Sequence, residues 1–155
     1  MRWLLVILLL SFSTYAQVKQ QPQLHLLKEA SSIPSVSLIQ QYSRILAVFQ
    51  NIEYGIRMCT VEEFKRELGA MVSIAIGSNE RGYFSMNQAA SVLSEYFSGR
   101  KSVSFEFSRI HEKGNAPYAT GRLVYIKKGN QESVQVYVSL TRQDSRWVIN
   151  QFNIY

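Results

Sequence analysis

The stretch GRKSVSFEFS, residues 99–108, decides the fold, because the spacing of apolar residues changes within it. Before Gly99, apolar side chains recur every three or four residues, the spacing that places them on one face of an α-helix. After it, Val103, Phe105 and Phe107 alternate with serine and glutamate, the period of a strand with one buried face. The sequence therefore predicts helices first and an antiparallel sheet after them.

Three later segments repeat the alternating pattern. They cover residues 118–127, 134–141 and 147–154, and turn sequences rich in Gly, Asn, Gln, Ser or Pro separate them. Connections of this length join neighbouring antiparallel strands. Together with the strand after Gly99 they predict a meander of four strands.

Three helices are expected upstream. The first covers residues 38–57, where apolar residues have helical spacing. The second begins at the capping box Thr60–Glu63 and ends near Gly69. After a short strand at 71–76 and a turn at 77–82, the third helix begins at a second capping box, Ser85–Gln88, and ends at Gly99.

The first sixteen residues have the pattern of a secretory signal peptide. Arg2 precedes an apolar run at 3–10, and small residues lead to a cleavage site between Ala16 and Gln17. The run is much shorter than the roughly 20 residues of a membrane span. We therefore expect an exported chain, periplasmic or secreted, soluble and without a transmembrane span. The cleavage site has no cysteine, so a lipid anchor is not expected.

Two regions should follow the signal peptide. Residues 17–37 are rich in Gln and Ser with no sustained period, which predicts a flexible tail or linker. Residues 38–155 are long enough for a single domain with its own core.

Cys59 is the only cysteine, so no internal disulfide can form. It precedes the first capping box, and Phe64 stands where a hydrophobic staple would meet it. We therefore expect a buried structural cysteine. A free thiol that pairs between chains is the alternative.

The order of these elements resembles the nuclear-transport-factor-2-like (cystatin-like) superfamily, in which a curved sheet wraps helices as a cone. More narrowly, the chain is similar to a family of uncharacterised exported Bacteroidetes proteins known as a domain of unknown function. The segments that carry the resemblance are Glu80–Phe97, Tyr118–Leu123 and Trp147–Tyr155. The resemblance implies an α+β fold with three N-terminal helices packed on a strongly curved, mainly antiparallel sheet.

Enzymes of that superfamily place an acid or base inside the cone, typically an Asp. The one aspartate here, Asp144, lies in a predicted turn, where bonding to nearby amides is its ordinary role. Glu106 alternates with phenylalanines and should face solvent if they are buried. His25, His111 and Cys59 lie too far apart in the sequence to predict a zinc site. We therefore expect no catalytic site, no metal and no cofactor.

Positive charge is concentrated in the C-terminal third. Residues 100–155 hold nine basic and four acidic side chains, whereas residues 17–99 hold seven of each. Outside the cytoplasm such a surface suits lipid phosphates or acidic polysaccharide better than nucleic acid. The alternative is an ordinary solvated surface.

Aromatic residues are the candidates for a ligand cavity between the sheet and the third helix. The predicted cavity-lining residues are Tyr96, Phe105, Phe107, Tyr118, Tyr125, Tyr137 and Phe152. Apolar walls with a few hydroxyls suit a small lipophilic ligand, but the same residues could fill a closed core. Tyr125 and Tyr137 could instead lie on the convex face, where the resemblance implies a possible homodimer.

Two hypotheses follow for the function. The first is an exported, non-enzymatic binding or interaction domain whose partner is a protein or an anionic envelope molecule. The second is a small lipophilic ligand-binding protein or an isomerase-like enzyme that uses the cone cavity. The second requires Glu106, His111 or a tyrosine to face inward.

Overall fold

The computed structural model describes residues 36–78 and 80–155. The predicted signal peptide, its cleavage site at Ala16 and Gln17, and the predicted tail up to residue 35 lie outside this part. Residues 39–155 form one compact unit. No helix among the described residues is long and apolar enough to cross a membrane.

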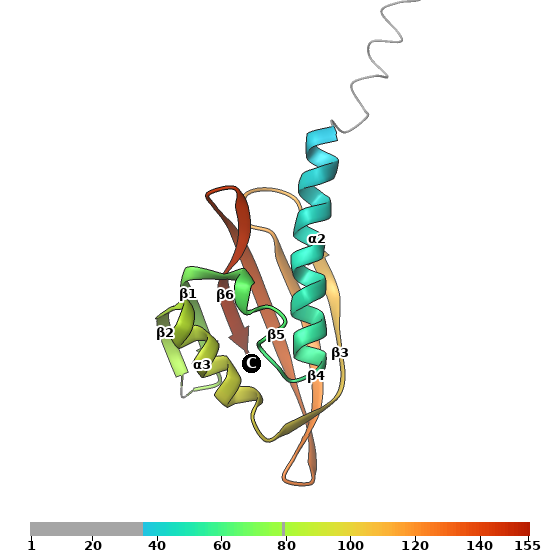
Figure 1. Ribbon diagram of the computed structural model, residues 1–155. Helices are drawn as coiled ribbons and strands as arrows, with labels where there is room; N and C mark the ends of the chain where they lie inside the picture. The colour runs from blue at the N-terminus through green and yellow to red at the C-terminus, as the bar shows by residue number, and fades with distance from the viewer. Residues whose placement is uncertain (1–35, 79) are drawn as a thin grey trace, which may run out of the picture. The chain divides into compact units, whose positions relative to one another are not determined.

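Two α-helices, a short 3-10 helix and six strands make up the described chain (Figure 1). In order they are α2 (Val36–Arg57), η2 (Lys65–Glu67), β1 (Leu68–Ile76), β2 (Glu80–Ser85), α3 (Met86–Phe97), β3 (Arg100–His111), β4 (Tyr118–Lys127), β5 (Asn130–Gln143) and β6 (Arg146–Ile154). The strands form one sheet in the order β2-β1-β6-β5-β4-β3. Only β1 and β6 pair in parallel. The α+β class and the four-strand meander are therefore confirmed.

Both α-helices lie on one face of the sheet, the helix-covered face (Figure 1). The α2 helix crosses the half formed by β3, β4 and β5, and the backbone N–H of Phe107 donates to Glu53 Oε2 at 3.1 Å. The α3 helix contacts β1 and β2. Bulges interrupt the registers of β3–β4 and β5–β6, and bulges bend a strand. The opposite side is called the outer face.

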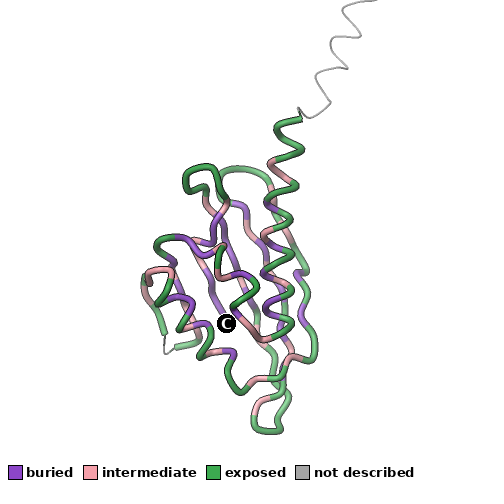
Figure 2. The backbone as a smooth tube through the Cα atoms, in the orientation of Figure 1, coloured by how far each residue is buried: buried purple, intermediate pink, exposed green. Residues whose placement is uncertain are grey.

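Buried and exposed residues alternate along β4 and part of β5 (Figure 2), so the buried side chains of these strands share one face of the sheet. The ring of Phe49 on α2 packs edge-on against that of Phe107, with 5.7 Å between the ring centroids. The rings of Phe105 and Phe107 also pack edge-on, with 5.0 Å between their centroids. Gly121 on β4 is required for this packing, because a Cβ there would lie 2.4 Å from the carbonyl oxygen of Glu106. The helix-covered face is therefore filled by phenylalanines where α2 crosses it.

The predicted second helix is wrong. Residues 61–64 form turns, η2 has only three residues, and β1 already begins at Leu68. The capping box does not form either, since Thr60 Oγ1 accepts from the amide of Glu62, at 3.4 Å, and not from that of Glu63. Phe64 is fully buried, stacks on Phe152 at 5.9 Å and lies against Gly55. Packing of this ring decides the backbone here and overrides local helix propensity.

The prediction of a turn at residues 77–82 is also partly wrong. Strand β2 begins at Glu80 and pairs antiparallel with β1 at the edge of the sheet. Its side chains are exposed or half-buried, so they lack the apolar alternation from which a strand is recognised. The capping box of α3 is confirmed, with the Ser85 amide donating to Gln88 Oε1 at 3.0 Å.

Cys59 ends α2 and does not introduce a helix. Its amide donates to the carbonyl of Ile56 at 3.0 Å, and the Thr60 amide donates to that of Gly55 at 2.9 Å. This pair of bonds is the Schellman motif, in which Cys59, at φ 50°, takes the left-handed position usually held by glycine. The thiol is half-buried against the core, and burial raises its pKa.

Candidate functional site

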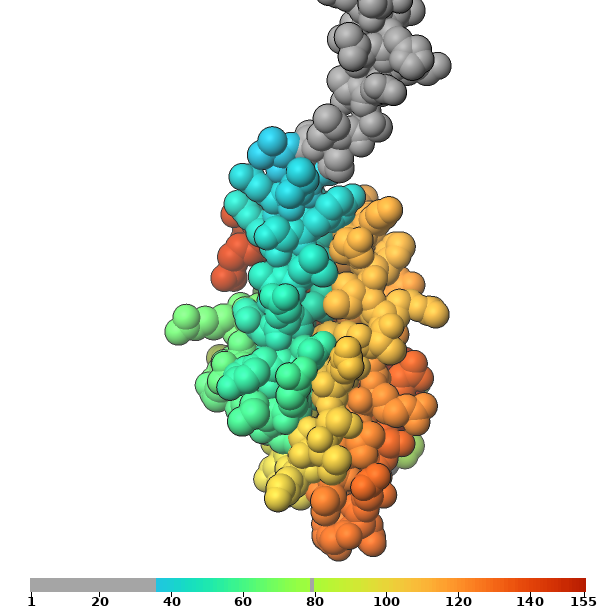
Figure 3. Space-filling model, turned by 90° about the vertical axis from the view of Figure 1, so that its right-hand side faces the viewer, coloured from blue at the N-terminus to red at the C-terminus, as the bar shows by residue number. Residues whose placement is uncertain are grey.

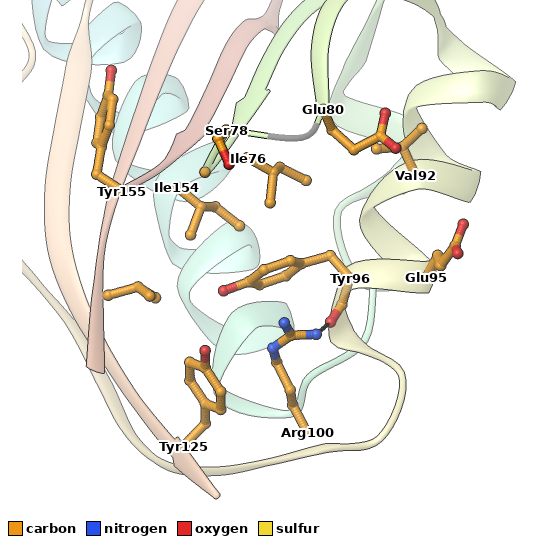
Figure 4. Close-up of a pocket in the computed structure, with 12 residues that line it drawn as sticks. Ile76, Ser78, Glu80, Val92, Glu95, Tyr96, Arg100, Tyr125, Ile154 and Tyr155 are labelled. Carbon is orange, nitrogen blue, oxygen red and sulfur yellow. Dashed lines mark hydrogen bonds between the residues drawn. The ribbon is translucent and has the colours of Figure 1, made fainter. Parts of the chain in front are cut away.

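A pocket of about 440 Å³ lies where the end of α3 meets the β1–β2 turn and the C-terminus (Figure 4). This size is within the range of small-molecule sites, roughly 300–1,000 Å³. Its lining combines aliphatic side chains with tyrosines and charged groups. The lining residues are Ile76, Gly77, Ser78, Glu80, Val92, Glu95, Tyr96, Arg100, Tyr125, Val134, Ile154 and Tyr155.

The local sequence brings Tyr96 and Arg100 together. Tyr96 is in the last turn of α3, Gly99 reverses the chain at φ 71°, and Arg100 begins β3. Arg100 Nη1 donates to the carbonyl oxygen of Tyr96, one of the acceptors that a helix leaves unpaired at its C-terminus. Part of the guanidinium is thus held by the end of α3.

The Arg100 guanidinium lies between two tyrosine rings. Its Cζ is 3.8 Å from the ring centroid of Tyr96 and 5.1 Å from that of Tyr125. Both distances are within the range of cation–π contacts. In the described part of the chain it makes no ion pair, and its Nε is buried without a partner. The pocket therefore holds a fixed cation with no carboxylate bound to it.

Hydrogen bonds link Tyr96 to Tyr125 and Tyr125 to Glu132. Tyr125 Oη donates to Glu132 Oε2 at 2.7 Å. Burial raises the pKa of Tyr96, and its hydrogen bond with Tyr125 raises it further; the neighbouring Arg100 acts in the opposite direction. Tyr96 therefore stays protonated at neutral pH and serves as a hydrogen-bond donor, not as a base.

Two carboxylates line the pocket, those of Glu80 and Glu95, and both residues are exposed. Glu106 and His111 are exposed and do not line the pocket. Among the residues that the structure describes, no cluster of three His, Cys, Asp or Glu side chains could hold a metal.

Of the seven aromatic residues predicted to line a cavity, Tyr96 and Tyr125 line this pocket. Phe105, Phe107 and Phe152 are buried in the core and are absent from its lining.

Tyr118 and Tyr137 are likewise absent from the lining, and they form an aromatic row with His111. The rings of His111 and Tyr118 stack with 5.2 Å between their centroids, and those of Tyr118 and Tyr137 stack with 5.8 Å between theirs. These residues alternate along the strands with the buried Ala119 and Val138, so the row lies on the outer face.

Sequence reasoning missed Arg100, which it counted only as one of the basic residues of the C-terminal third. Two signals could have identified it: it follows the helix-ending Gly99 directly, and it stands four residues after Tyr96. A cation at that position can reach the last carbonyl groups of the helix.

Comparison with solved structures supports the fold. A DUF4783 family protein from Bacteroides uniformis is 18% identical with a TM-score of 0.61, over 68% of this chain and 93% of that chain. A cystatin-like domain of unknown function from Nostoc punctiforme is 13% identical with a TM-score of 0.58, over 74% and 76%. An NTF-2 like protein of unknown function from Shewanella oneidensis is 11% identical with a TM-score of 0.51, over 72% and 96%.

No curated protein matches the chain. At the sequence level, residues 49–155 match the domain of unknown function DUF4783. The predicted resemblance to a Bacteroidetes family with this fold is therefore confirmed. The chain belongs to the DUF4783 family and has the nuclear-transport-factor-2-like, cystatin-like fold.

Proposed function

We propose that this chain is an exported, non-enzymatic binding domain whose pocket takes a small amphipathic ligand with one anionic group. The signal-peptide pattern of residues 1–16 supports export. The observation that carries the proposal is Arg100, a cation held between Tyr96 and Tyr125 with no carboxylate paired to it in the described chain.

The rest of the lining favours a ligand with an apolar body. Ile76, Val92, Val134 and Ile154 supply aliphatic surface to the same pocket, and Figure 4 labels three of them, Ile76, Val92 and Ile154. An anionic group beside Arg100 can accept a charge-assisted hydrogen bond from the guanidinium. These features match a monocarboxylate with a hydrocarbon chain.

The number of charges on the ligand is limited by two glutamates. Glu80 and Glu95 also line the pocket, and their carboxylates repel a second negative charge. A single carboxylate beside Arg100 is therefore favoured over a di- or trianion.

The isomerase-like alternative has one supporting observation, since the Tyr96 and Tyr125 side chains do line the pocket. Such chemistry also needs a base that removes a proton from carbon. Glu80 and Glu95 are both exposed, so among the described residues no buried carboxylate lines the pocket. Binding without chemistry is the better-supported function.

Calorimetric titration with octanoate, octanol and octylamine tests the proposal, because the three probes differ mainly in the charge of the head group. We expect octanoate to bind the full-length chain at least about tenfold more tightly than octanol, a difference of about 1.4 kcal/mol, and octylamine to bind worst. Arg100→Gln should remove the preference for octanoate, and Arg100→Lys should retain part of it.

Arg122→Gln is the matched control, since it removes the same charge from an exposed position outside the pocket. Circular dichroism of each variant shows whether it is folded. Equal binding of octanoate and octanol by the unmodified chain, or no octanoate binding, would contradict the proposal.

A further inference from the structure

A second hollow lies between α2, η2 and the β5–β6 turn, and we call it the arginine groove. Its volume is about 550 Å³, and it shares no residue with the pocket around Arg100. In Figure 3 the β5–β6 turn, in red, is seen beside α2, in cyan. The groove is lined by Arg44, Ala47, Val48, Asn51, Arg66, Glu67, Ser145, Arg146 and Trp147.

Three arginines converge on this groove from three separate elements. Arg44 comes from α2, Arg66 from η2 and Arg146 from the start of β6. All three are exposed, and within the described chain none forms an ion pair. Planar guanidinium groups bind carboxylate, sulfate or phosphate oxygens in bidentate fashion. The fold therefore gathers several unpaired anion-binding groups at one place.

Part of the lining of the groove is apolar. Ala47 and Val48 lie between Arg44 and Asn51 on one face of α2, since the four residues are three or four positions apart. Trp147 is half-buried and packs against the core while it also lines the groove. A ligand in the groove would therefore lie against an indole ring and short aliphatic side chains while its anionic groups reach the arginines.

Neutral polar groups and one carboxylate complete the lining. Asn51 Nδ2 donates to Glu67 Oε1 at 2.9 Å, which fixes that carboxylate beside α2. Asn51 Oδ1 can accept a hydrogen bond from a ligand, and the Ser145 hydroxyl can donate or accept one. Three arginines against one glutamate leave the groove moderately positive, which suits a ligand with spaced charges better than a dense polyanion.

We infer that the arginine groove binds an acidic oligosaccharide, one that carries a carboxylate or sulfate on its sugar units. The C–H face of a pyranose ring packs flat on an indole ring, the hydroxyl groups bond to Asn51 and Ser145, and the acidic groups pair with the arginines. The signal-peptide pattern of residues 1–16 supports an exported chain, for which acidic saccharides are commoner partners than nucleic acid. The inference does not depend on the proposed ligand of the Arg100 pocket.

Fluorescence of Trp147 gives a direct readout. The chain has two tryptophans, Trp3 and Trp147, so the full-length Trp3→Phe variant reports on the groove alone. We would titrate it with tetragalacturonate and with a chondroitin sulfate tetrasaccharide, which carry about one charge per sugar unit, and with neutral maltotetraose. At least one acidic tetrasaccharide should shift the Trp147 emission and bind at least about tenfold more tightly than maltotetraose, with an affinity that falls as salt rises.

The variant Arg44→Gln with Arg146→Gln should weaken binding of the acidic tetrasaccharide at least tenfold. Arg109→Gln with Arg122→Gln is the matched control, because it removes the same charge from two exposed positions on β3 and β4 outside the groove. Unchanged emission with both acidic tetrasaccharides would overturn the inference, as would equal binding of maltotetraose or equal losses in the two double variants. Since octanoate binding depends on Arg100, its retention in the groove variant separates this result from the proposed function.

Discussion

Aromatic rings occupy two regions of the helix-covered face, yet one region is closed and the other is open. Under α2, Phe49 and Phe107 pack edge-on and are buried. Beyond the end of α3, Tyr96 and Tyr125 flank Arg100 beside a pocket of about 440 Å³. A phenylalanine has no polar atom and can be enclosed on all sides, whereas a tyrosine hydroxyl and a guanidinium need partners. Polar groups among the rings, and not aromatic content, distinguish the pocket from the core.

The largest effect should come from breaking the closed region. Phe49→Ala keeps a good helix former in α2 but removes a fully buried ring that contacts Phe107. We expect the free energy of unfolding to fall by about 3–5 kcal/mol, because transfer and cavity costs add. Urea unfolding followed by circular dichroism measures the change.

Tyr125→Phe is the matched change in the open region. It keeps the ring and removes only the hydroxyl that donates to Glu132, so we expect a loss of about 0.5–1.5 kcal/mol. If Phe49→Ala and Tyr125→Phe lower the free energy of unfolding equally, the closed and open regions do not differ in packing as described.

The pH dependence of stability should sharpen the same contrast. Tyrosine in an unfolded chain ionises near pH 10, whereas the pKa of Tyr96 in the folded chain is raised. Folding therefore favours the protonated form, and its contribution to stability is complete below pH ~10 and declines as the pH rises above it. Between pH 9.5 and 11.5, urea unfolding of Tyr96→Phe should show a shallower decline than that of the unmodified chain.

Tyr83→Phe serves as the control for this profile. Tyr83 is 78% exposed on β2, so removing its hydroxyl should leave the slope unchanged. If Tyr96→Phe has the slope of the unmodified chain, the Tyr96 hydroxyl is not shielded by the fold.

The smallest effect should be at Cys59, which lies near Arg100 and the backbone of Ser102. Cys59→Gly relieves a left-handed backbone position and loses a half-buried side chain. These opposing terms should leave the free energy of unfolding within about 1 kcal/mol of that of the unmodified chain. Because burial raises its thiol pKa, Cys59 should also react with a thiol reagent more slowly in the folded chain than in urea.

Rapid labelling of the folded protein would show that the Cys59 thiol is open to solvent. A loss of several kcal/mol in Cys59→Gly would show instead that its packing outweighs the backbone strain.

Patterns that repeat over many residues were readable from the sequence. The alternation after Gly99 predicted the meander β3–β6, and the box at Ser85–Gln88 predicted the start of α3. Thr60–Glu63 carries the same kind of box, yet no α-helix follows it. The difference lies in Phe64, whose ring is fully buried between Gly55 and Phe152.

The edge strand β2 and the candidate site depended on more distant contacts. Strand β2 has no buried alternation and forms because β1 offers it a free edge. Tyr96 could be proposed from its place on the apolar face of α3. Arg100 belongs to no repeating pattern, and only its position after Gly99 and four residues after Tyr96 indicates it. Tyr125 completes the pair from β4 only after the chain has folded.

The sequence by itself determined the α+β class, the helices α2 and α3 and the final meander, because these features rest on local periodicity and on residues that are neighbours in the chain. The family was identified from a resemblance over longer segments. Only the tertiary structure decided which aromatic residues fill the core and which flank Arg100, and that Arg44, Arg66 and Arg146 meet in one groove. Burial and unpaired charge depend on which segments pack together, and the spacing of apolar residues within one segment does not predict that packing.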